Sequence, residues 1–149
     1  MKKIFILSCA LLLLGVSSCK KNDKTTTTTN IAVTVKSGVT QTASSGATVN
    51  LYVSATAATA GSAPDYNATA DQTGKATFSN VNAGTYYVVA VNGAAKNYYS
   101  GLIPIGYTNG AVVYQDTNGD GKIDANDKVT APSVTVASGA TSAFTAVIY

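Results

Sequence analysis

From residue 31 onward, the chain alternates short apolar runs with turn-forming residues. Leu51 and Val53, and later Phe144, Ala146 and Ile148, recur at every second position, which is the period of a strand with one buried face. Gly, Asn, Asp and Ser separate these runs, and the sequence has no long helical period. The pattern predicts strands at 31–36, 48–55, 66–70, 76–79, 85–91, 96–103, 111–115, 129–136 and 142–149. Several short strands with close turn signals indicate an all-β, antiparallel β-sandwich.

The amino terminus has a different pattern. Lys2 and Lys3 precede an apolar run at 4–14 that is shorter than the ~20 residues needed to cross a bilayer. This order predicts a signal peptide over residues 1–18. The following Val16-Ser17-Ser18-Cys19 resembles the lipobox of bacterial lipoproteins, in which the cysteine is acylated and becomes the first residue after cleavage. The resemblance implies a lipid on Cys19, and the alternative is an ordinary secretory signal with a spare thiol.

The residues after Cys19 indicate the cellular location of the protein. No aspartate follows the cysteine directly, as in Gram-negative outer-membrane lipoproteins. We therefore expect an outer-membrane lipoprotein that contacts the membrane through its lipid and faces the cell surface or the periplasm. We expect residues 19–30 to form a lipidated, threonine-rich tether, and a first edge strand is the alternative for residues 24–30. Residues 31–149 are long enough for one domain.

Composition excludes several functional classes. Removal of residues 1–18 takes away Lys2 and Lys3, which leaves eight lysines (10 − 2) against seven aspartates. Without arginine or a basic stripe, no nucleic-acid partner is expected. The chain has no histidine, and Cys19 is the predicted lipid carrier, so Ser-His-Asp and Cys-His machinery is missing. We expect a protein that is not an enzyme.

The acidic loop at 116–127 carries the most specific chemistry. Oxygen-bearing side chains occupy positions 1, 3, 5, 9 and 12 of a twelve-residue loop, Gly121 falls at the turn position 6, and Lys122 can offer its backbone carbonyl at position 7. Carboxylate and amide oxygens suit Ca²⁺ and not zinc. We expect a calcium ion that clamps the structure, and the alternative is a metal-free polar turn. The side-chain ligands are Asp116, Asn118, Asp120, Asp124 and Asp127.

This loop resembles the calcium loops of dockerins and EF-hands, and Asp127 in place of glutamate at position 12 favours the dockerin version. Dockerins carry two such loops, each followed by a helix. Here a β-branched segment with Pro132 follows a single loop, and it predicts a strand. The resemblance therefore implies the ion but not the dockerin's partner.

A second resemblance concerns the middle of the chain. Asp71, Gly74, Phe78, Gly84 and Tyr86 match a D-x-x-G-x-x-x-F pattern followed by G-x-Y. This spacing resembles the carboxypeptidase regulatory-like domain. The resemblance implies a transthyretin-like (prealbumin-like), Greek-key sandwich of about seven to nine strands, in which these five residues are framework.

Nine tyrosines keep a binding function open. Tyr98, Tyr99, Tyr107 and Tyr114 are candidate stacking surfaces for a glycan or a surface protein, and packing in the core is the alternative. The leading expectation is a calcium-stabilised structural or protein-interaction module. The alternative is a carbohydrate-capturing surface lipoprotein. A contiguous exposed tyrosine face would favour capture, and packed tyrosines would favour the structural role.

Overall fold

The computed structural model describes residues 28–149, which form an all-β sandwich and confirm the predicted fold class. The signal peptide, Cys19 and most of the tether lie outside these residues. The two helical elements are α1 (Ala55–Ala60) and the 3₁₀ helix η1 (Ala125–Asp127). No helix of the described residues, these two included, is long and apolar enough to cross a bilayer. The strands are β1 (Asn30–Ser37), β2 (Thr48–Tyr52), β3 (Tyr66–Thr69), β4 (Lys75–Ser79), β5 (Gly84–Asn92), β6 (Ala95–Lys96), β7 (Pro104–Thr108), β8 (Ala111–Tyr114), β9 (Ser133–Val136) and β10 (Thr141–Ile148).

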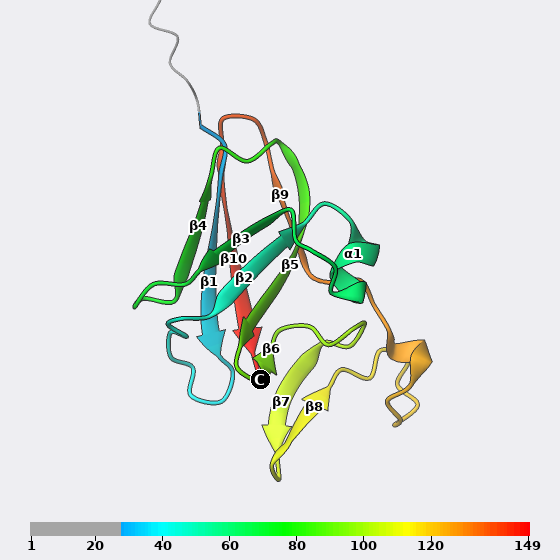
Figure 1. Cartoon of the computed structure of the whole chain (residues 1–149). Coiled ribbons are helices and arrows are strands. Elements are labelled where there is room, and N and C mark those ends of the chain that lie inside the picture. The colour runs from blue at the N-terminus through cyan, green and yellow to red at the C-terminus, as the bar shows by residue number, and fades with distance from the viewer. Residues whose placement is uncertain (1–27) are drawn as a thin grey trace, which may run out of the picture.

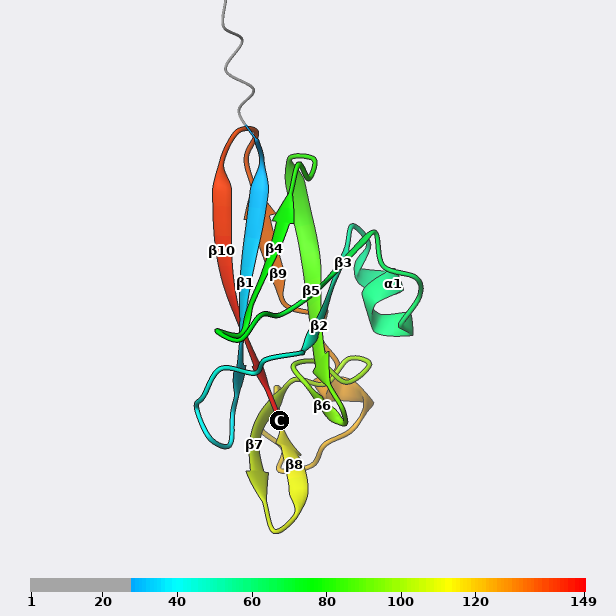
Figure 2. The ribbon, with the colours of Figure 1, turned by 60° about the vertical axis from the view of Figure 1, so that its left-hand side comes forward.

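Two sheets form the sandwich, and a separate hairpin extends from it. One sheet has the order β10-β1-β4, and the other has the order β3-β2-β5, with β6 and β9 both paired to the far edge of β5. Figure 2 shows the sheets side by side, with α1 on the outer side of the second sheet. The β7–β8 hairpin lies at the end opposite residue 28 (Figure 1). All strand pairs are antiparallel except β1 and β10, which most of the chain separates, as a parallel pair requires.

The main core lies between the two sheets. In β1, Ile31, Val33 and Val35 are fully buried, and the residues between them are only half-buried, as a two-residue period requires. They meet inward-facing side chains of both sheets, so the alternation seen in the sequence determines the face that each strand buries. These side chains are Val49, Leu51, Ala76, Phe78, Tyr86, Val88, Ala90, Val134, Val136, Ala146 and Ile148.

β5 is covered on both faces. Its residues at even positions from Tyr86 to Ala90 face the main core, whereas Tyr87 and Val89 face the opposite side. α1 lies on that side (Figure 2), and a second apolar cluster forms there. Because a strand buried on both faces reads as a continuous apolar run, the sequence Tyr-Tyr-Val-Val-Ala-Val suits this position. The buried members of the second cluster are Tyr52, Ala58, Tyr98 and Ala131.

One asparagine completes the edge of β5 between β6 and β9. The Oδ1 of Asn97 accepts the N–H of Ala90 at 2.8 Å, and its Nδ2 donates to the carbonyl of Val88 at 3.0 Å. The N–H of Val88 donates to the carbonyl of Pro132 at 2.7 Å. Asn97 is only 4% exposed, so its carboxamide replaces a missing strand for backbone groups that would otherwise be buried without partners.

The predicted strand at 48–55 ends early, because the chain turns into α1. Ser54 caps the helix, with its side chain accepting the N–H of Ala57 at 3.4 Å. Gly61 ends the helix in the left-handed conformation. A serine before an alanine-rich segment and a glycine after it are ordinary helix boundaries. The six-residue helix is too short to show a helical period.

Other boundaries also differ from the prediction. The strand predicted at 96–103 breaks after Lys96, since Ser100 and Gly101 adopt positive φ angles of 50° and 113°, and β7 follows in a region predicted as a loop. β9 begins at Ser133 and not at residue 129. β1 begins at Asn30, one residue before the predicted start, and Thr29 before it is buried.

The turn before β4 gives a stability prediction. Gly74 has a φ of +76°, and an added Cβ would lie 2.5 Å from the carbonyl oxygen of Val35. We expect Gly74→Ala to lower the free energy of unfolding by about 3 kcal/mol, measured by urea denaturation, because backbone strain and a steric clash add together. Gly46→Ala is the matched control, with a φ of +77° and open space around its Cβ, and it should cost only about 1 kcal/mol. Equal losses for the two variants would contradict the steric explanation.

Candidate functional site

The acidic loop connects β8 to η1 and continues toward β9, at the side of the sandwich away from residue 28 (Figure 1). Both flanks of the loop are fixed to the segment that follows β6. The N–H of Gln115 donates to the carbonyl of Ile103 at 2.9 Å, and the N–H of Val129 donates to the carbonyl of Gly101 at 2.8 Å. Both ends of the loop are therefore held by backbone hydrogen bonds to the same segment.

The first half of the loop coils around Asp116. Its carboxylate accepts the N–H of Gly119 at 2.6 Å and the N–H of Gly121 at 2.8 Å. Gly121, at position 6, has a φ of +78°, which glycine adopts without strain. The side chains of Asn118 and Asp120 each accept the N–H two residues ahead, at 3.0 and 2.8 Å. These contacts form the sharp turn expected at the middle of the loop.

Asp127 joins the two ends of the loop. It is 1% exposed, and its carboxylate accepts the N–H of Asp124 and the N–H of Thr117, each at 2.8 Å. These hydrogen bonds, that from Asp124 above all, lower the pKa of Asp127. A carboxyl with a lowered pKa stabilises the fold above its ordinary pKa, and the contribution is lost as the pH falls through the lowered value. The carboxylate of Asp127 thus joins the two ends of the loop through hydrogen bonds.

The donor set fits calcium in its chemistry, although the loop is open. The side chains of Asn118, Asp120 and Asp124 are exposed, and Asp116 is half-buried. Within residues 28–149, no three acidic side chains converge closely enough to hold a metal ion in this conformation. A carboxylate oxygen that accepts one N–H keeps a second lone pair, so both oxygens of Asp116 and the Oδ2 of Asp127 stay available as ligands. The Oδ1 of Asp127 accepts both the N–H and the hydroxyl of Thr117.

The four candidate tyrosines lie at two separate places. Tyr98 is 2% exposed, and its hydroxyl donates to the carbonyl of Val129 and contacts the hydroxyl of Thr59, each at 2.8 Å. It is part of the second apolar cluster. The rings of Tyr99 and Tyr114 meet edge to face at 5.4 Å near the β7–β8 hairpin.

Tyr107 is the exposed member of the set, at 51%. Its hydroxyl donates to the carbonyl of Gly110 at 2.9 Å, and it borders a cavity of about 390 Å³ together with Tyr99 and Tyr149. The hydroxyl of Tyr99 donates to the carbonyl of Tyr149 at 2.6 Å, and burial raises the pKa of Tyr99. The four tyrosines therefore do not form one contiguous face.

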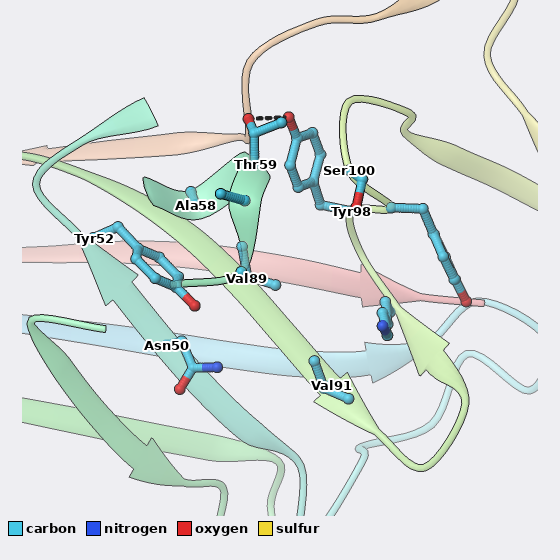
Figure 3. Close-up of a pocket in the computed structure, with 12 residues that line it drawn as sticks. Asn50, Tyr52, Ala58, Thr59, Val89, Val91, Tyr98 and Ser100 are labelled. Atoms are coloured by element: carbon cyan, nitrogen blue, oxygen red, sulfur yellow. Dashed lines mark hydrogen bonds between the residues drawn. The ribbon is translucent and has the colours of Figure 1, made fainter. Parts of the chain in front are cut away.

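A second cavity, of about 330 Å³, was not predicted from the sequence. It lies between α1, the outer face of β2 and β5, and the turn at 98–100 (Figure 3). Asn50 and Tyr52 border it, with the hydroxyl of Tyr52 directed toward the space beside Asn50 and Val89. Burial raises the pKa of this hydroxyl. The available signal was the alternation of Asn50 and Tyr52 with buried Val49 and Leu51, but only the fold shows that a helix covers that face.

No protein-family model matches the chain, and a search of curated proteins gives no match.

Asp127 gives a prediction about the metal-free loop. We expect Asp127→Asn to lower the melting temperature in EDTA, because an amide nitrogen cannot accept one of the two N–H groups that the buried carboxylate accepts. The matched control is Asp120→Asn, which changes an exposed carboxylate of the same loop and should shift the melting temperature less. Identical melting temperatures for the two variants would show that Asp127 does not stabilise the fold by joining the two ends of the loop.

Proposed function

We propose that this protein is a calcium-stabilised, non-catalytic structural or protein-interaction module, held at the outer membrane by a lipid on Cys19. The observation that carries the calcium part is the coiling of the loop around Asp116, whose carboxylate accepts the N–H groups of Gly119 and Gly121. This contact places the carboxylate at position 1 against the turn at position 6, as a twelve-residue calcium loop requires.

The ion would be held by the side-chain oxygens of five residues and by the carbonyl of Lys122. It would neutralise four carboxylates within twelve residues, which repel one another when no cation lies between them. Exposed Asp120 and Asp124 would move inward as the ion binds. The five side chains are Asp116, Asn118, Asp120, Asp124 and Asp127.

A structural role for the ion is supported by the fixed flanks of the loop. The loop is tied to the carbonyls of Ile103 and Gly101, and the carbonyl of Val129, just after the loop, accepts the Tyr98 hydroxyl. An ion that tightens the loop would therefore hold the segment after β6 and the approach to β9. The packed state of Tyr98 and Tyr99 favours the structural role over capture by a tyrosine face.

The lipid anchor agrees with the layout of the domain. Residue 28 lies at the end of the sandwich opposite the β7–β8 hairpin (Figures 1 and 2). A chain anchored through Cys19 would present this hairpin away from the membrane. Ile105 and Tyr107 of β7 are more than half exposed, so the hairpin offers an apolar surface for a protein partner.

The calcium proposal predicts a metal-dependent melting temperature. At a free calcium concentration ten times the Kd, binding should add about 1.4 kcal/mol, or roughly 5 °C, relative to EDTA. Asp120→Ala should abolish this difference, because it removes a ligand. Lys122→Ala is the control, since this residue contributes only its backbone carbonyl, and its calcium shift should match that of the unaltered chain. Equal melting of the unaltered chain in calcium and in EDTA would refute the ion.

The anchor proposal predicts a change of fractionation. Cys19→Ser should move the protein from the membrane fraction to the soluble fraction, because the acylated side chain is lost. Cys9→Ser alters the other cysteine of the chain, within the apolar run, and should leave the protein in the membrane fraction. Immunoblots of the separated fractions measure both. If the Cys19→Ser protein stays with the membranes, lipidation is not the anchor.

A further inference from the structure

The cavity beside α1 is built by the register of three strands. Residues directly opposite each other in antiparallel strands share a face. The register pairs Asn50 with Val89, and it pairs Val91 with both Thr48 and Lys96. All of these residues face away from the main core. α1 and the turn at 98–100 form the walls above this face, and the resulting open cavity has a volume of about 330 Å³ (Figure 3).

The cavity exposes a polar group with no protein partner. The side chain of Tyr52 is packed, with only 3% of the residue exposed, but its hydroxyl opens to the cavity and has no hydrogen-bond partner among residues 28–149. A hydroxyl can both donate and accept a hydrogen bond, so this group is free to bind a ligand. The half-buried carboxamide of Asn50 lies beside it and likewise makes no hydrogen bond within the described residues (Figure 3). Together they offer one hydroxyl and one amide to a ligand.

Two other hydroxyls at the cavity are already engaged. Thr59 and Tyr98 contact each other at 2.8 Å, and Tyr98 donates to the carbonyl of Val129. They hold α1 against the turn at 98–100 and so fix the wall. Thr59 and Tyr98 therefore build the cavity, whereas Asn50 and Tyr52 remain for a ligand.

The charge and the apolar surface of the cavity define the ligand further. Lys96 is the only charged residue of the described chain that borders it, with its Nζ 5.7 Å from the centre of the Tyr99 ring. No carboxylate from residues 28–149 borders the cavity to neutralise this ammonium. Val89 and Val91 are half-buried and offer a C–H surface beside the polar groups. A ligand that matches these features carries a carboxylate, several hydroxyls and an apolar ring face.

We propose that this cavity binds a single sugar acid, a hexose-sized ring with a carboxylate. Lys96 binds the carboxylate, Asn50 and Tyr52 bind ring hydroxyls, and the valines contact the ring. The volume is near the lower limit for small-molecule sites and suits one ring. The cavity is separate from the acidic loop, so this proposal goes beyond the structural function. Either proposal can be wrong while the other is right.

Calorimetric titration of the purified full-length chain tests the site with three probes: sodium D-glucuronate, D-glucose and sodium acetate. We expect glucuronate to bind and glucose to bind at least about tenfold more weakly, because glucose lacks the charge contact. Acetate should bind more weakly than either, because it lacks the ring. Absence of glucuronate binding, or equal affinity for glucuronate and glucose, would overturn the proposal.

Variants then assign the contacts. Tyr52→Phe keeps the packed ring and removes only the hydroxyl, and it should weaken glucuronate binding by about tenfold. Lys96→Gln should remove the preference for glucuronate over glucose. The control Tyr107→Phe removes a hydroxyl at the exposed hairpin and should leave the affinity unchanged. Circular dichroism melting verifies that each variant is folded. Unchanged glucuronate affinity in folded Tyr52→Phe would show that the ligand lies elsewhere.

Discussion

The two-sided burial of β5 is the constraint on which the rest of the structure depends. This strand is apolar at successive positions from Tyr86 to Val91, so neither face can be left to water. Its inner face packs against the sheet that contains β1. Its outer face needs a second cover, and α1 supplies part of it. Both edges of the strand must also find partners for their backbone groups, and β2, β6 and β9 are not enough to complete them. Asn97 and Pro132 complete the far edge.

These covers explain why the two candidate sites lie on one side of the sandwich. Asn97 fixes the chain where it leaves β6, and the next residue, Tyr98, enters the cluster on the outer face of β5. The hydroxyl of Tyr98 then holds Val129, which follows the acidic loop. A wall of the cavity beside α1 and one flank of the loop therefore share a single buried tyrosine. Packing that is required for stability places a polar cavity and an acidic loop within one connected layer.

The proposed functions use different parts of this layer. The loop contributes charge, which a hard cation can neutralise, and its fixed flanks transmit any tightening to neighbouring segments. The cavity contributes shape, and its polar groups are the ones that the fold leaves without internal partners. The β7–β8 hairpin lies outside the layer, and its apolar side chains are exposed far from residue 28. If the proposed ion and anchor are present, these three features would combine a scaffold held by calcium with surfaces open to ligands and partners.

The sequence by itself determined the all-β class and most of the strands, and it fixed the spacing of carboxylates in the acidic loop on which the calcium proposal rests. These depend on local signals, namely a two-residue apolar period, turn-forming residues and the spacing of carboxylates along the chain. Only the tertiary structure decided that β1 and β10 run parallel, that Asn97 replaces a missing strand, and that Tyr98 is packed in a cluster. It also decided that Asn50, Tyr52 and Lys96 border one cavity. The physical reason is that pairing partners and the cover over a second apolar face come from segments distant in the chain, where a local pattern carries no information about contact.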